Sequence, residues 1–93
     1  MVRNEELRPT SYATRLLAET VCGLIDAQSL SRNRVCLALG RSQTYVSIRI
    51  RGMAPWNTDD LDKLAKLFGY SNLFSLMDVA RGTTPRELVR KDM

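Results

Sequence analysis

The stretch that decides the fold reads Ser29-Leu-Ser-Arg-Asn-Arg-Val-Cys-Leu-Ala-Leu-Gly40-Arg-Ser-Gln-Thr-Tyr-Val-Ser-Ile-Arg-Ile-Arg-Gly52. Serine is a preferred helix N-cap, so Ser31 predicts a short helix over residues 32–39 and Ser42 predicts another over about residues 43–50. Gly40 lies between the two helices, and glycine forms a left-handed turn without strain. Two short helices joined by a tight turn are therefore predicted. Apolar residues four apart are expected to hold them together: Val35, Leu39, Val46 and Ile50.

Helical periodicity also predicts one helix before this pair and one after it. Apolar residues recur at intervals of three and four over about residues 12–27, after the helix-start residues Thr10 and Ser11. Further along, Asn57 is expected to cap a helix that ends at Gly69. The acidic residues in its first turn favour the helix dipole.

The remaining local signals lie around this last helix and beyond it. Trp56 and Leu61 have the spacing of a hydrophobic staple, although a buried Trp56 serves the core at least as well as any function. Ser71 is expected to cap a fifth helix over about residues 72–81. Residues 84–87, Thr-Pro-Arg-Glu, have the form of a capping box with proline at the first helical position.

The predicted fold class is all-α, a compact five-helix domain over residues 10–81. No segment alternates as a strand would. Residues 1–9 are expected to form a flexible N-terminal arm, and residues 82–93 a C-terminal tail or short terminal helix. A chain of 93 residues has the size of one small domain.

Composition argues against an enzyme. Histidine is absent, which removes the commonest general base and the commonest neutral metal ligand. Cys22 and Cys36 lie in apolar helical runs without metal-ligand spacing, so we expect two buried free thiols. There is no glycine-rich phosphate loop and no apolar run of the roughly 18 to 20 residues that span a membrane. We therefore expect a cytoplasmic protein with no catalytic site, metal, cofactor, small-molecule substrate or membrane partner.

The positive charge is concentrated in the central third of the chain. Between Asp26 and Asp59 there are five arginines and no acidic residue, whereas the rest of the chain holds nine basic and ten acidic residues. Arginine presents a planar fork of donors that suits phosphate oxygens and guanine edges. A solvated basic face is the plain alternative reading of these arginines.

The spacing of cap, glycine, second cap and closing glycine fits a helix-turn-helix, a DNA-binding arrangement. Arg32 and Arg34 lie in the first turn of their helix, where positive charge opposes the helix dipole by a few tenths of a kcal/mol each. Such placement makes sense if that end faces a phosphate backbone. The residues expected to contact phosphates are Arg32, Arg34, Arg41, Ser42, Tyr45, Arg51 and Asn57. For Tyr45, packing of the ring against the domain is an equal alternative, and Asn57 is first of all a helix cap.

Residues 12–81, and most strongly residues 29–69, resemble the phage Cro and repressor type of helix-turn-helix, the XRE family. The resemblance rests on Ser31 before the second helix, Gly40 in the turn and Gly52 after the third helix. It also rests on small Cys36, on Val46-Ser47 and on the stretch Leu64-Ala65-Lys66-Leu67-Phe68-Gly69. It implies a transcriptional regulator, such as a phage or prophage repressor or a Cro-like protein, that occupies an operator in double-stranded DNA.

The resemblance implies that the bases are read from Gln43, Thr44 and Ser47. Glutamine pairs bidentately with adenine. Two departures from the family pattern give two further candidate base readers. Ile48 could contact a thymine methyl. Arg49 could contact guanine or a phosphate, or form a surface salt bridge. A third departure is Arg32, which stands where the family often has a glutamine that reaches toward the start of the third helix.

The fifth helical segment has apolar residues on more than one face. Leu73, Leu76, Met77 and Ala80 can pack against the domain, which leaves Phe74 and Val79 outward. The segment is then either a buried last helix or a homodimer seam. Resemblance favours a seam, formed by Leu73, Phe74, Met77 and Val79, because such repressors pair two-fold over inverted repeats. The competing function is an antitoxin-like or adaptor protein whose main role is to bind a protein partner.

Overall fold

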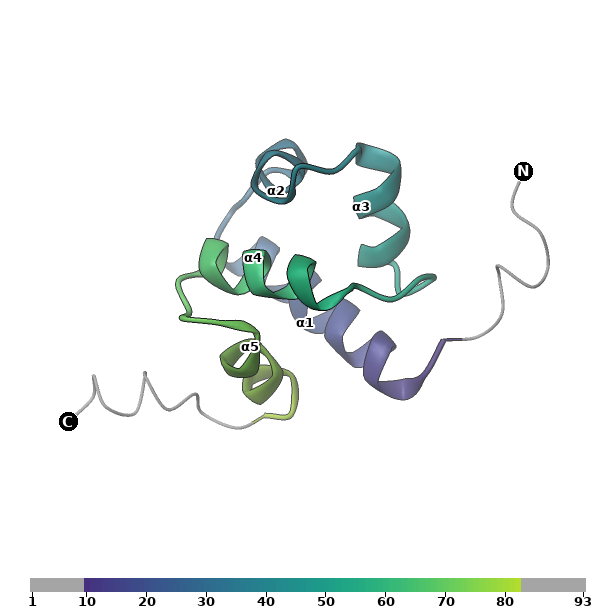
Figure 1. The fold of residues 1–93 in the computed structure, drawn as a ribbon, viewed down its shortest axis with the longest axis vertical. Helices are drawn as coiled ribbons and strands as arrows, with labels where there is room; N and C mark the ends of the chain where they lie inside the picture. The colour runs from purple at the N-terminus through teal and green to yellow at the C-terminus, as the bar shows by residue number, and fades with distance from the viewer. Residues whose placement is uncertain (1–9, 83–93) are drawn as a thin grey trace.

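The computed structural model describes residues 10–82, and over these residues the protein is an all-α domain of five helices (Figure 1). The predicted fold class is confirmed. Residues 1–9 and the capping-box residues 84–87 lie outside the described residues. The helices are α1 Tyr12–Ala27, α2 Arg32–Leu39, α3 Gln43–Ile50, α4 Thr58–Phe68 and α5 Leu73–Ala80.

Side-chain caps set the helix starts, as the sequence predicts for α1 to α4. The hydroxyl of Ser31 accepts the backbone N–H of Arg34, and the hydroxyl of Ser42 accepts that of Tyr45, each at 3.1 Å. Gly40 ends α2 in the left-handed region with φ 66°. The local rules that link serine and glycine to helix ends therefore fix the two short helices.

The start of α5 differs from the prediction. The cap is Asn72, whose side chain accepts the N–H of Phe74, and not Ser71. The N–H of Leu73 donates to the Asp62 carboxylate of α4 at 3.1 Å. A contact from another helix thus contributes to fixing this boundary, and a sequence pattern within residues 71–74 does not contain that contact.

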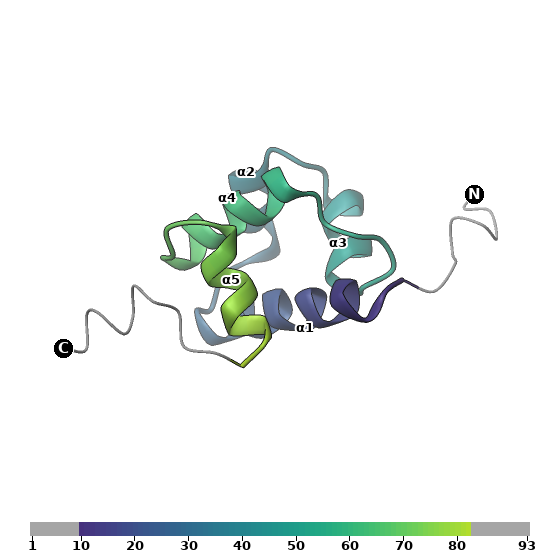
Figure 2. The same ribbon diagram turned by 60° about the horizontal axis from the view of Figure 1, so that its bottom comes forward.

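The core lies between α4 and the other helices. α4 packs against α1, α2 and α5, and α1 also packs against α3 and α5 (Figures 1 and 2). The residues predicted to join α2 and α3 are all buried, and so are Trp56 and Leu61. The core cluster is formed by Val21, Ile25, Val35, Cys36, Leu39, Val46, Ile50, Trp56, Leu61, Leu64, Ala65, Phe68 and Leu76.

The turn after α3 rests on the start of α1. Gly52 has φ 77°, and a Cβ atom there would lie 3.6 Å from the Cβ of Ala18. The hydroxyl of Thr10 donates to the Gly52 carbonyl at 2.8 Å. These contacts hold the C-terminal end of α3 against α1, so the first turn of α3 is directed away from this anchor.

Two further expectations can be compared with the structure. Cys36 is buried and Cys22 is half-buried, and both are free thiols. Among the helices of residues 10–82, none is long and apolar enough to cross a bilayer.

Candidate nucleic-acid interface

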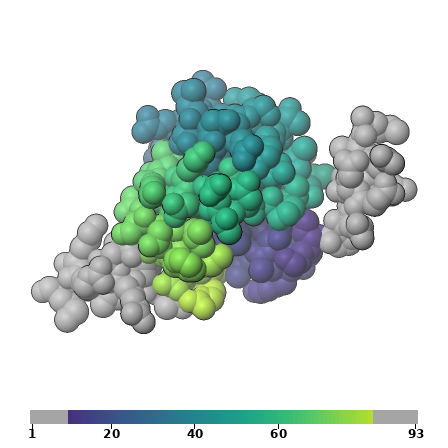
Figure 3. Space-filling view, viewed as in Figure 1, coloured from purple at the N-terminus to yellow at the C-terminus, as the bar shows by residue number. Residues whose placement is uncertain are grey.

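The first turns of α2 and α3 lie next to each other at one end of the molecule. The Nε2 of Gln43 on α3 donates to the side-chain Oδ1 of Asn33 on α2 at 3.4 Å. Gln43 and Thr44 are exposed, and so is the capping residue Ser42. The blue and teal atoms of α2 and α3 form one continuous end of the molecule (Figure 3). This end therefore presents short polar side chains and a helix N-terminus together.

Arg32 links the two helices at the same end. Its Nη1 donates to the hydroxyl of Ser47 at 2.8 Å. Two side-chain contacts therefore link α2 and α3 at this end, Arg32 to Ser47 and Gln43 to Asn33. Two of the five predicted base readers on α3, Gln43 and Ser47, are held by α2 side chains in the free protein.

Arg49 is folded back onto the domain. Its Nε donates to the Pro55 carbonyl at 3.1 Å, and its Nη1 donates to the Tyr45 carbonyl at 3.2 Å. The guanidinium lies 3.5 Å from the centre of the Tyr45 ring, a stacked cation–π contact. In this rotamer Arg49 braces α3, so reading of a base requires the side chain to swing outward. Ile48 is half-buried beside it.

A buried carboxylate lies behind α3. Asp60, in the first turn of α4, has no exposed surface. Its Oδ2 accepts the Tyr45 hydroxyl at 2.5 Å, and its Oδ1 pairs with the Nε of Arg41 at 3.3 Å. Burial and then the hydrogen bond to Asp60 raise the pKa of Tyr45 above its ordinary value near 10. In the free protein the Tyr45 hydroxyl therefore serves an internal contact.

The other predicted phosphate contacts are distributed over three elements. Arg34 is exposed in the first turn of α2, and Arg51 is exposed at the end of α3, where its Nε donates to the Ser47 carbonyl at 3.4 Å. Asn57 lies before α4, and its side chain accepts the Asp60 N–H at 2.7 Å. Asn57 is thus a helix cap, as expected first of all for it.

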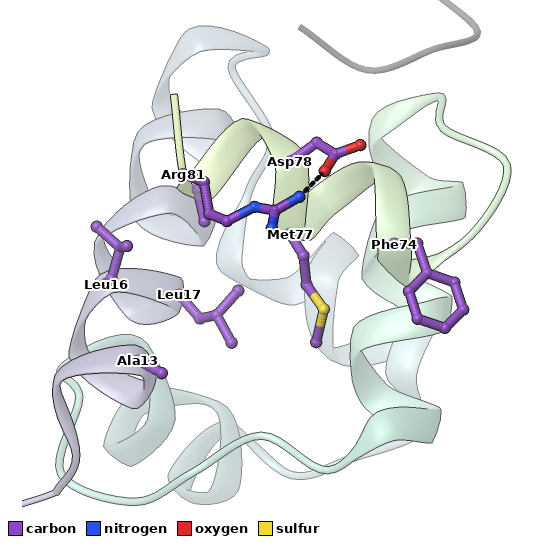
Figure 4. Close-up of a pocket in the computed structure, with 8 residues that line it drawn as sticks. Ala13, Leu16, Leu17, Phe74, Met77, Asp78 and Arg81 are labelled. Atoms are coloured by element: carbon purple, nitrogen blue, oxygen red, sulfur yellow. Dashed lines mark hydrogen bonds and ion pairs between the residues drawn. The ribbon is translucent and has the colours of Figure 1, made fainter. Parts of the chain in front are cut away.

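A groove of about 440 Å³ lies between α1 and α5, away from the α2 and α3 pair (Figure 4). Phe74 is 68% exposed at this groove and Met77 lines it, whereas Leu73 and Val79 are half-buried and are not part of its lining. An ion pair of Asp78 with Arg81 lies at its edge. Of the four residues predicted for a dimer seam, only Phe74 and Met77 therefore share this surface.

Sequence reasoning missed Asp60 and Asn33. Asp60 counts in the sequence as a favourable charge at a helix start, and nothing local indicates that it is buried. An acid at the third helical position next to a tyrosine and an arginine of another element is found only from the fold. Within the described residues, no three His, Cys, Asp or Glu side chains gather as a metal site.

Comparison with known proteins adds no relative to this description. No family model, no curated protein and no solved structure matches the chain at a significant level. The arrangement of its own side chains is therefore the basis for a functional proposal.

Proposed function

We propose that the protein is a sequence-specific regulator that binds double-stranded DNA through a helix-turn-helix formed by α2 and α3. The observation that carries the proposal is the pairing of the first turns of α2 and α3, where exposed Gln43 contacts Asn33 and Arg32 contacts Ser47. Arg34 is exposed in the same first turn of α2. A helix N-terminus flanked by arginines favours phosphates, and short polar side chains suit base edges.

In this proposal α3 enters the major groove with its N-terminal turn foremost. Gln43 pairs with adenine, and Thr44 donates or accepts at an adjoining base or phosphate. Arg32 and Arg34 on α2, with Arg51 at the far end of α3, meet the backbones that border the groove. Occupation of an operator would then regulate transcription without a cofactor or a chemical step.

A second candidate function is the binding of a protein partner at the groove between α1 and α5. Exposed Phe74 favours it because this aromatic residue borders an apolar groove, and aromatic residues are common anchors of protein contacts. The arginines around α2 and α3 have no role in that function, so we rank it second.

The experiment that separates the two candidates is selection of bound duplexes from a randomised library at about 0.15 M salt. Enrichment of a defined sequence supports the proposal. Inverted half-sites about 10 base pairs apart would add a two-fold dimer, and a single half-site would indicate a monomer. Recovery of duplexes without any preferred sequence contradicts the proposal and favours the partner-binding candidate.

The selected duplex permits a direct test of Gln43. Gln43→Ala removes a bidentate partner of adenine, so binding to the selected duplex should weaken by about 1–3 kcal/mol. Binding to random DNA should hardly change, because phosphate contacts are retained. Titration of both duplexes by fluorescence anisotropy measures the two losses. Equal losses on both would contradict base reading by Gln43.

A further inference from the structure

Asp60 connects three elements through one buried carboxylate. It belongs to α4, its hydroxyl partner Tyr45 belongs to α3, and Arg41 belongs to the turn between α2 and α3. Arg49 stacks on the same Tyr45 ring, and the Arg41 guanidinium lies 4.4 Å from the ring centre. The four side chains therefore form one cluster behind the exposed turn of α3.

Stability alone is a poor reason for this arrangement. Removing a carboxylate from water is unfavourable, and an ion pair offsets the lost hydration only when its geometry is good. A buried apolar residue of similar volume would usually serve the core as well or better. The charge at Asp60 therefore suggests a role in fixing one arrangement of the neighbouring elements.

The contacts of Asp60 restrain both α3 and the turn before it. Through the Tyr45 hydroxyl it holds the first turn of α3, and through Arg41 it holds the turn that precedes α3. Arg41 uses Nε for this pair and its side chain stays 38% exposed, so other N–H donors of the guanidinium remain available to a phosphate. Base reading requires placement within about 0.5 Å, which a loosely held helix of eight residues does not provide.

We propose that Asp60 is a positioning residue of the DNA interface, which sets discrimination between DNA sequences by locking α3 and restraining Arg41. This inference rests on the proposed function. It assigns to Asp60 no contact with DNA. An Arg41 released from Asp60 gains freedom to pair with any phosphate, which favours non-specific binding, while a less restrained α3 loses base contacts.

The test compares Asp60→Asn with Asp59→Asn. Both changes remove one negative charge from the first turn of α4, but Asp59 is exposed and lies outside the cluster. For Asp60→Asn we expect the ratio of affinities for selected over random duplex to fall about tenfold, with random-duplex affinity unchanged or raised. Asp59→Asn should keep the ratio. Equal ratios for the two variants would overturn the inference.

A second variant keeps the test decisive if Asp60→Asn does not fold. Tyr45→Phe removes only the hydroxyl and keeps the ring under Arg49. It should lower the same ratio, by less than Asp60→Asn, and an unchanged ratio would count against the inference.

A spectroscopic readout separates this inference from the proposed function. Ultraviolet titration of free Asp60→Asn should show a lower pKa for the Tyr45 phenol than in the wild type, because one cause of its raised value is removed. An unchanged pKa would contradict the contact itself. If the wild type prefers no duplex, the proposed function fails and the inference fails with it, whatever the titration shows.

Discussion

At the residue scale, Tyr45 couples the candidate interface to pH. Its pKa is raised above about 10 in the folded protein, first by burial and then by Asp60. A raised pKa means that folding favours the protonated phenol. The phenol's contribution to the free energy of unfolding is therefore fully present below the pKa that Tyr45 has in the unfolded chain. It is lost as pH rises through the higher folded value.

We therefore predict that the wild type loses stability more steeply above about pH 10 than Tyr45→Phe does. The phenylalanine has no proton to lose, while every other titrating group is common to both proteins. Urea unfolding followed by circular dichroism between pH 7 and 11 measures the two profiles. Parallel profiles over that range would contradict the role assigned to the phenol.

The arginines show what the sequence predicts at this scale and what it does not. Arginine-rich residues 32–51 were recognisable because charge can be counted along the chain. The same count along the chain found no acidic residue between Asp26 and Asp59. In the folded protein, however, Asp60 is paired with Arg41, and Arg49 is folded onto Tyr45. Asp60 and its partners Arg41 and Tyr45 are 15 to 19 residues apart and meet only in the folded domain, which no local pattern encodes.

At the element scale, the boundaries of α1 to α4 were predictable because a capping side chain acts within three residues of its own position. Ser31, Ser42 and Asn57 cap as expected, and Gly40 and Gly69 close their helices. The prediction of Ser71 as the cap of α5 was wrong, since Asn72 accepts the N–H of Phe74 and the N–H of Leu73 donates to the Asp62 carboxylate of α4. Ser71 and Asn72 are adjacent residues of capping type, and the contact from Asp62 of α4, which the local sequence does not contain, accompanies the choice of Asn72.

Ser42 allows the cap of α3 to be separated from its proposed function. Ser42→Ala removes the acceptor for the Tyr45 N–H and should cost about 1 kcal/mol of stability. Ser42→Asn and Ser42→Asp both restore an N-cap acceptor, and both should fold about as stably as the wild type. Only the aspartate brings a negative charge to the end of α3 that is proposed to face DNA.

We therefore expect DNA affinity to persist in Ser42→Asn and to fall at least about tenfold in Ser42→Asp. Thermal unfolding and anisotropy titration on the same samples measure stability and affinity side by side. If the aspartate variant binds as tightly as the asparagine variant, the start of α3 does not approach a phosphate backbone.

At the scale of the whole molecule, two surfaces lie on different elements. The arginine-bearing surface belongs to α2, α3 and their turn. The apolar groove belongs to α1 and α5 (Figure 4). The all-α class and the helix order followed from periodicity and caps. The separation of the two surfaces could not be predicted from the sequence, because it depends on how α4 packs between α2 and α5.

This separation supplies a matched pair of charge changes. Arg34→Ala removes an exposed charge from the first turn of α2, and Arg81→Ala removes one that is paired with Asp78 at the groove. Both lower the net charge of the molecule by one. A general attraction between a basic protein and DNA would respond equally to both, whereas a contact at α2 responds only to Arg34.

We predict that Arg34→Ala lowers the slope of log affinity against log salt by about 0.9, the value for one phosphate contact in duplex DNA. The free energy of unfolding should be unchanged or higher by a few tenths of a kcal/mol, because the substitution removes a positive charge that opposes the helix dipole at the N-terminus of α2. Arg81→Ala should keep the wild-type slope. Anisotropy titrations on random duplex between 50 and 200 mM salt would reveal the difference, and matching slopes for the two variants would remove Arg34 from the DNA interface.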